Sequence, residues 1–208
     1  MVPEELDHIV YATPRLEETV GAFAGLTGVR PAAGGSHPGL GTRNCLVALG
    51  GRSYLEIIGP DPGQPAPQRP RPFGIDRLTE PKVATWVLRP ADFDATVRAS
   101  RGRGYDPGRT VTMGRAAADG TRLTWRLTDI DAAHPSGLVP FLVDWGSAGH
   151  PTGAALPETA LTGLVLRTPD APEVRSRLRA LGVGAAVTTG PRRLAFTVEG
   201  RTGPVTFG

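Results

Sequence analysis

Apolar and polar positions along the chain alternate in short runs. Residues 6–12 and 53–59 are two such runs, rich in aliphatic and β-branched side chains and bounded by turn-forming residues, so both predict short β-strands. Side chains alternate between the two faces of a strand, which places His8 on one face of the first strand and Glu56 on one face of the second. If the strands are neighbours, an imidazole and a carboxylate meet on one surface.

The same order of elements, a strand followed by a helix and then further strands, is predicted three times along the chain. The three first strands are expected at residues 6–12, 83–88 and 161–166. The three helices open near prolines that recur at nearly equal spacing, at Pro14, Pro90 and Pro169. We therefore predict an α+β protein built from tandem βαβββ units rather than one doubly wound sheet.

The predicted units divide the chain unevenly. The first unit covers residues 1–60, the second residues 82–150, and a shortened third residues 158–208. Residues 61–81 hold many of the prolines, and proline at this density favours an extended linker over packed structure.

Composition narrows the class of protein. The 28 glycines and 21 prolines are spread over turn positions, which indicates many short elements instead of disorder. The net charge is only +3 and the arginines alternate with acids, so nucleic-acid binding is not expected. No apolar run approaches the roughly 20 residues of a membrane span, and residues 1–5 do not resemble a signal peptide, so a soluble, cytoplasmic protein is expected. The single Cys45 allows no intramolecular disulfide and is expected in the core.

Each candidate for chemistry has an alternative explanation. Glu56 is costly to bury among aliphatic neighbours without a counter-charge, which could be a metal ion or an arginine. His8 could equally be a hydrogen-bonded core residue. His37 lies in a glycine-rich stretch, either close to a ligand or exposed in a loop. His134 and His150 precede prolines and are expected to be loop residues.

Four stretches together resemble the glyoxalase-like branch of the vicinal oxygen chelate superfamily, which includes glyoxalase I, extradiol dioxygenases and bleomycin-resistance proteins. These stretches are residues 6–10, 35–44, 54–58 and 140–146, and the resemblance extends over most of residues 5–150. It implies that two βαβββ units pair into a curved, cup-like mixed sheet, with helices outside and a divalent metal inside.

The resemblance also implies where the ligands lie. The superfamily takes its metal ligands from the first and last strands of each unit, and His8 and Glu56 match the two positions of the first unit. The second unit departs from this pattern. Its first strand offers no good ligand, and its last strand places Val143 opposite Glu56 and offers Asp144 only if the register slips by one residue.

The combined prediction is a metal-dependent enzyme of lyase, isomerase or dioxygenase type that acts on a small oxygen-rich molecule. His8, Glu56 and His37 would hold a zinc, manganese, iron or nickel ion, and Glu56 would also be catalytic. The residues expected to contact substrate are His37, Arg43, Asn44, Trp86, Trp125 and Asp144. The alternatives are a metal-free protein of the same fold that binds or sequesters a small molecule, and a partner-binding module that pairs into a homodimer.

Overall fold

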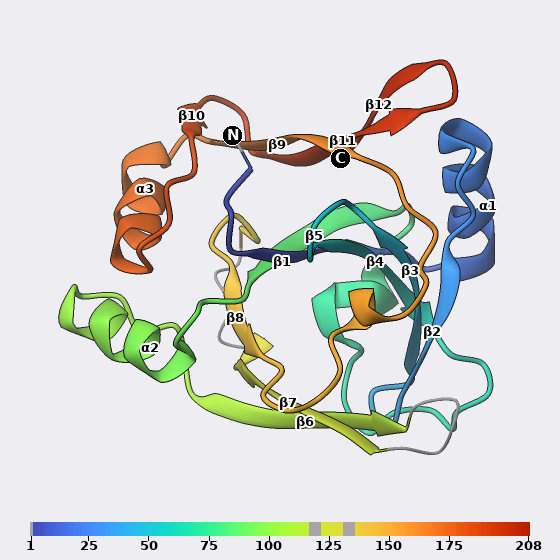
Figure 1. Ribbon diagram of the computed structural model, residues 1–208, viewed down its shortest axis with the longest axis horizontal. Coiled ribbons are helices and arrows are strands. Elements are labelled where there is room, and N and C mark those ends of the chain that lie inside the picture. The colour runs from blue at the N-terminus through green and yellow to red at the C-terminus, as the bar shows by residue number, and fades with distance from the viewer. Residues whose placement is uncertain (1, 117–121, 131–135) are drawn as a thin grey trace.

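Two β-sheets and three α-helices form the computed structural model, which describes residues 2–116, 122–130 and 136–208 (Figure 1). The larger sheet has eight strands in the order β2-β3-β4-β1-β5-β8-β7-β6, and the smaller has four in the order β10-β9-β11-β12. The predicted α+β class is confirmed.

Each predicted unit contains a strand, a helix and three further strands. The elements of the first unit are β1 (Leu6–Ala12), α1 (Leu16–Thr27), β2 (Ala32–His37), β3 (Thr42–Ala48) and β4 (Tyr54–Pro60). Those of the second are β5 (Lys82–Leu88), α2 (Phe93–Gly102), β6 (Thr110–Ala116), β7 (Arg122–Thr128) and β8 (Phe141–Asp144). Those of the third are β9 (Leu161–Thr168), α3 (Ala171–Ala180), β10 (Val187–Thr189), β11 (Arg193–Gly200) and β12 (Gly203–Phe207). Each helix begins two or three residues after the proline that predicted it.

The first two units join along one antiparallel seam between β1 and β5. On either side of the seam the strands follow the same order, because the last strand of each unit pairs in parallel with its first strand, β4 with β1 and β8 with β5. The eight-stranded sheet curls until its edge strands β2 and β6 approach each other. The predicted cup-like sheet is therefore confirmed, and its concave face encloses a hollow.

The third unit covers the outer face of this sheet. In Figure 1 the small sheet lies above β1 and β5, with α1 at one end and α3 at the other. The larger hydrophobic core lies between these layers, where Ile9 and Trp86 from the seam meet Phe23 of α1 and Phe196 of β11. Both faces of the central strands are thus buried.

The third unit differs from the first two in its pairing. Its first strand, β9, lies between β10 and β11, whereas β12 pairs only with β11 at the sheet edge. In the first unit the first strand β1 pairs with the last strand β4. The elements predicted for residues 158–208 are present, but they form a sheet of different topology.

The second half of the connection over residues 61–81 packs against the core, so the expectation of an extended linker is wrong there. A 3₁₀ helix, η1 (Pro72–Arg77), presses Ile75 into the core beneath the concave face, where the residue is fully buried. Phe73 and Pro72 line the hollow itself. Proline limits the backbone conformations of this segment but does not stop its apolar side chains from packing.

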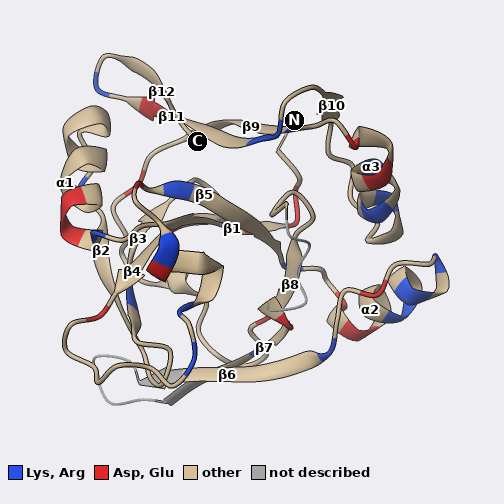
Figure 2. Cartoon of the chain, turned by 180° about the vertical axis from the view of Figure 1, so that it is seen from behind, with Lys and Arg blue, Asp and Glu red and all other residues tan. Residues whose placement is uncertain are grey.

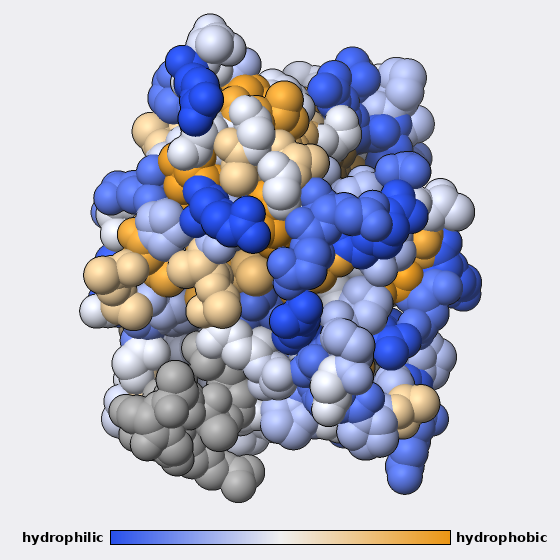
Figure 3. Space-filling model, turned by 90° about the vertical axis from the view of Figure 1, so that its right-hand side faces the viewer, coloured by the Kyte–Doolittle hydropathy of each residue, from blue (hydrophilic) through white to orange (hydrophobic). Residues whose placement is uncertain are grey.

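The surface carries both signs of charge. Figure 2 shows acidic and basic residues side by side on the helices and loops, with no continuous basic face in that view. On the side next to α1, hydrophobic residues show between polar ones (Figure 3). Within the parts of the chain described above, no helix has the length and apolar character needed to cross a membrane.

Candidate functional site

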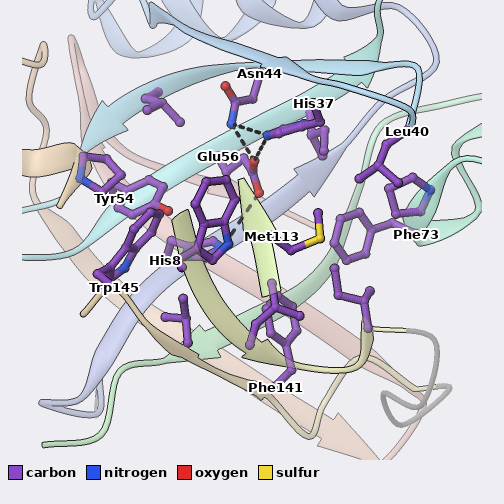
Figure 4. A pocket seen from close by; sticks show the side chains of 18 residues that line it. His8, His37, Leu40, Asn44, Tyr54, Glu56, Phe73, Met113, Phe141 and Trp145 are labelled. Carbon is purple, nitrogen blue, oxygen red and sulfur yellow. Dashed lines mark hydrogen bonds and ion pairs between the residues drawn. The ribbon is translucent and has the colours of Figure 1, made fainter. Parts of the chain in front are cut away.

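The hollow on the concave face is a partly open cavity of about 70 Å³. One side is formed by strands of the first unit and carries His8, His37, Asn44 and Glu56 (Figure 4). The other side is formed by the second unit and η1. Polar side chains therefore gather on one wall only.

Pairing of β1 with β4 brings the two predicted residues together. The strands are parallel neighbours in which His8 lies opposite Tyr54 and Val10 opposite Glu56, so His8 and Glu56 are on the same face one step apart. Both side chains are buried, and His8 Nε2 lies 3.8 Å from Glu56 Oε2. The imidazole also stacks on the ring of Tyr54, with 4.7 Å between ring centroids.

The Glu56 carboxylate has no arginine partner among the described residues. Asn44 Nδ2 donates to its Oε1 at 2.6 Å, and the nearest nitrogens of His37 and His8 lie 3.9 and 3.8 Å from its two oxygens. The alternative that an arginine neutralises this carboxylate is therefore wrong for the described part of the chain. The counter-charge that burial demands must come from the imidazoles or from a bound cation.

His37 belongs to the same cluster. It ends β2, its side chain is buried, and its Nδ1 lies 3.1 Å from Thr42 Oγ1. Its Nε2 faces Glu56 and lies 3.4 Å from Asn44 Nδ2. The expectation that His37 lies in the site agrees with this position, and the alternative of an exposed loop histidine is wrong.

A β-bulge supports His8 from behind. The register of β1 against β5 shifts between Leu6 and His8, so that Asp7 is the extra residue. A bulge re-aims side chains that a regular strand would send to opposite faces. Here it lets Asp7 Oδ1 lie 2.7 Å from Nδ1 of its own neighbour, His8. A carboxylate on Nδ1 fixes the imidazole orientation and leaves Nε2 turned toward the cavity.

The second carboxylate oxygen of Asp7, Oδ2, accepts hydrogen bonds from three further side chains. Arg89 Nε and Trp145 Nε1 each lie 3.1 Å from Oδ2, and His150 Nε2 lies 3.0 Å away. The backbone N–H of Thr152 donates to His150 Nδ1, so Nε2 carries the proton given to Asp7. Burial alone would raise the pKa of Asp7, but the hydrogen bonds hold it well below its usual range.

Sequence reasoning missed Asp7 and His150. In a regular strand Asp7 would face away from its neighbour His8, and the bulge in β1 changes this arrangement. His150 was expected to be a loop residue, and it is outside the strands, but its ring is buried against Tyr54 and Trp145. An Asp-His pair was visible in the sequence, whereas nothing local marked His150. His134 lies outside the described residues.

The second unit contributes an apolar wall. Met113, Trp125, Leu127, Phe141 and Val143 line the cavity opposite the first unit's polar groups. Val143, the residue expected at the position in the second unit's last strand that matches Glu56, lines the cavity. The described residues that the second unit contributes to this wall are thus apolar.

Three residues expected to contact substrate lie elsewhere. Asp144 points away from the cavity and pairs with Arg126 at 2.6 Å, because its neighbour Val143 takes the inward face of β8. Arg43 pairs with Glu17 of α1 at 2.8 Å, on the outer side of β3. These two expectations are corrected by the alternation of the strands that carry the residues.

Trp86 is the third correction. It lies opposite Ile9 in the seam, on the face away from His8, and is completely buried in the larger core. Its indole N–H donates to the carbonyl oxygen of Leu138 at 3.0 Å, so the side chain is a structural core residue. Trp125, by contrast, does line the cavity.

The donors available for a divalent ion are Nε2 of His8, Nε2 of His37 and the carboxylate of Glu56. Two imidazoles and one carboxylate are a ligand set that suits such ions, and both Nδ1 atoms already have partners behind them. The observed separations of 3.8 and 3.9 Å exceed the about 3 Å between neighbouring ligands of an octahedral ion. As placed, no three His, Cys, Asp or Glu of the described residues are arranged to hold an ion. The three ligand types suit a divalent ion, and the distances between the donor atoms would have to shorten for all three to bind it.

Comparison with known proteins places this geometry in a family. The glyoxalase-like domain family matches residues 6–182. A hypothetical protein from Staphylococcus aureus has a similar structure, with a TM-score of 0.60 and 11% identity over 97% of this chain and 84% of the other. No curated protein matches.

Methylmalonyl-CoA epimerases are also similar, at lower TM-scores. The enzyme from Mycobacterium tuberculosis has a TM-score of 0.45 and 19% identity over 73% of this chain and 93% of its own. That from Streptomyces coelicolor has a TM-score of 0.44 and 22% identity, over 71% and 98%. The family match covers most of the chain and agrees with the paired βαβββ units and the cup. The chain belongs to the family of proteins with a glyoxalase-like domain.

Proposed function

We propose that this protein is a metal-dependent enzyme that acts on a small oxygen-rich substrate in the cavity of the first two units. His8, His37 and Glu56 would hold the ion. The observation that carries the proposal is a buried carboxylate facing two imidazole Nε2 atoms, with both Nδ1 atoms bound on the far side.

The charge balance of the site supports a cation at this point. Glu56 is buried, accepts one amide hydrogen bond from Asn44 and has no arginine or lysine beside it in the described structure. Neutral imidazoles would leave this carboxylate uncompensated, at a cost of several kcal/mol for an isolated buried charge. A divalent ion or a proton on a histidine removes this cost.

The residues around the ion would have separate tasks. Asp7 holds the His8 ring in place through Nδ1. Asn44 donates to Glu56 Oε1, and Glu56 lines the cavity, where its other oxygen, Oε2, would exchange a proton with substrate. Trp125 and Phe141 exclude water from the opposite side. When bound, a divalent ion would supply Lewis-acid polarisation of a substrate oxygen.

A metal-free binding protein is the second candidate. The observation that favours it is the apolar wall of the second unit, which offers no ligand to an ion. In that case the charge on Glu56 would be balanced by protonated His8 or His37, and the cavity would bind its ligand without chemistry.

Elemental analysis of protein purified without a His tag tests the proposal. We expect near-stoichiometric metal in the parent and its loss in both His8→Ala and Glu56→Gln. Asp144→Asn is the matched control, because this carboxylate pairs with Arg126 outside the cavity. Circular dichroism confirms that the variants fold.

The contrary result is equally clear. If the parent binds no metal after incubation with manganese, iron, zinc or nickel, the enzyme hypothesis fails in this form. Saturable binding of a small molecule by the metal-free protein would then support the second candidate.

A further inference from the structure

The cavity divides into a polar end and an apolar body. The polar groups gather where β1, β3 and β4 meet, around Glu56 and Asn44. In Figure 4 the side chains of Phe73, Met113 and Phe141 lie on the other side of the Glu56 carboxylate from Asn44. A ligand with its oxygen atoms at the polar end must therefore place the rest of its structure against apolar side chains.

No positively charged side chain lines this apolar part in the described structure. Among the described residues, the lining contains one carboxylate, two histidines and no lysine or arginine. Three arginines of the surrounding elements have acidic partners, since Arg126 pairs with Asp94 and Asp144, Arg89 donates to Asp7, and Arg71 pairs with Asp76. A carboxylate or phosphate on the ligand body would lose its hydration without gaining a counter-charge.

A positive charge on the ligand body is also disfavoured. Glu56 is the single carboxylate of the described lining, and it lies at the polar end beside Asn44. An ammonium group at the far end would lie among Met113, Leu127 and Phe141, which form one hydrophobic cluster. Both signs of charge are thus disfavoured on the body.

The cavity volume shows how much of a ligand can be enclosed. The cavity measures about 70 Å³. A dry cavity of about 150 Å³ is known to enclose a benzene molecule. The closed part of the cavity is therefore smaller than one benzene ring, and the ring of a larger ligand must continue along the apolar wall toward the open side.

We infer, building on the proposed function, that the substrate is a small molecule with one oxygen-bearing end and an uncharged, apolar body. The oxygen-bearing end faces Glu56 and Asn44, and the body lies against Met113, Trp125 and Phe141. This excludes substrates whose body carries a carboxylate, a phosphate or an ammonium group inside the cavity.

Three phenols with one head and different far ends test the inference. They are 4-methylphenol, 4-hydroxybenzoate and 4-hydroxybenzylamine, titrated into chelator-treated protein by calorimetry and again after reconstitution with manganese. We expect saturable binding of 4-methylphenol and at least about tenfold weaker binding of both charged probes, because the charged group would lie against the apolar wall and lose more than about 1.4 kcal/mol of hydration without gaining a counter-charge. Equal or tighter binding of either charged probe, or no binding of 4-methylphenol, overturns the inference.

A charge introduced into the wall gives a second readout. Met113→Lys places an ammonium group beside the apolar body, and we expect it to raise the affinity for 4-hydroxybenzoate at least about tenfold relative to 4-methylphenol, because the two charges would meet in a partly desolvated cavity. Thr112→Lys is the matched control, because this neighbour on β6 is exposed and does not line the cavity. An equal gain in both variants would show only a general charge effect and refute the assigned wall.

The outcome is separable from that of the proposed function. If 4-methylphenol binds selectively to protein that never takes up metal, the substrate class stands and the metal proposal fails. If metal is bound stoichiometrically and the charged phenols bind as well as the neutral one, the reverse holds.

Discussion

Replacing Asp7 by asparagine should destabilise the whole fold, although Asp7 does not line the cavity. The carboxylate is completely buried and accepts hydrogen bonds from His8, Arg89, Trp145 and His150. An amide has only one acceptor oxygen, and its NH2 group would face groups that are themselves hydrogen-bond donors. The substitution also leaves the Arg89 guanidinium without its anionic partner.

The expected magnitude follows from breaking a buried charge network. Removing one partner of such a network typically costs roughly 3–5 kcal/mol. For a domain of this size each kcal/mol corresponds to about 2–4 °C in Tm, so the Tm should fall by roughly 6–20 °C. The free energy of unfolding from urea denaturation, followed by circular dichroism with an unchanged m-value, measures the effect directly.

The pH dependence of the unfolding free energy gives a second test of the Asp7 hydrogen-bond network. The folded-state pKa of Asp7 is lowered, so its stabilisation is fully present above the unfolded-state pKa of about 3.9. It is lost as the pH falls toward the folded-state pKa. The difference in unfolding free energy between parent and Asp7→Asn should be constant from about pH 5 to pH 7.5 and should shrink below about pH 4.

A surface carboxylate provides the control for both measurements. Asp106 is exposed and, among the described residues, bonds with Arg101 and the backbone N–H of Gly108, so Asp106→Asn should change stability by less than about 0.5 kcal/mol. An Asp7→Asn protein within 1 kcal/mol of the parent, on the scale of roughly 3–5 kcal/mol expected for a buried charge, would refute the reasoning. It would mean that the four donors find other partners or that the site is hydrated.

Three further predictions concern other parts of the chain. Gly137→Ala should destabilise by more than roughly 2 kcal/mol in urea denaturation, because a Cβ there would lie 1.9 Å from the Ala84 carbonyl oxygen and the φ of +68° disfavours a side chain; a smaller loss would show that the backbone yields. The Cys45 thiol should react with iodoacetamide more slowly than glutathione near neutral pH, since burial raises its pKa, and an equal rate would contradict this. Arg43→Gln should leave metal content and phenol binding unchanged, because the guanidinium pairs with Glu17 on α1, and a loss of either would return Arg43 to the site.

Much of the architecture follows from local patterns in the sequence. Short alternating runs predicted the strands, and nearly equal spacing of helix-opening prolines predicted the repeated units. His8 and Glu56 could be placed on a shared surface because the period of a strand is two and the last strand of a unit pairs with its first.

The errors arise where pairing between distant strands decides the outcome. The face of Trp86 depends on how β5 pairs with β1, which no local pattern specifies. Asp144 would reach the cavity only after a slip of one residue, and Val143 keeps the inward face instead. His150 reaches Asp7 only because the chain after β8 passes back over the first unit. In the third unit, the order of β9 and β12 was unpredictable for the same reason, since the same elements allow more than one pairing.

The seam between β1 and β5 has a consequence for how the site could arise. Two identical chains joined at such a seam would present the same side chains from both halves, so that any carboxylate on one wall would face its own copy on the other. Here the halves belong to one chain and are free to diverge. One half carries the ionisable groups His8, His37 and Glu56, and the other supplies Met113 and Trp125 in their place. Covalent fusion of the two halves thus permits an asymmetric chamber within a nearly symmetric sheet.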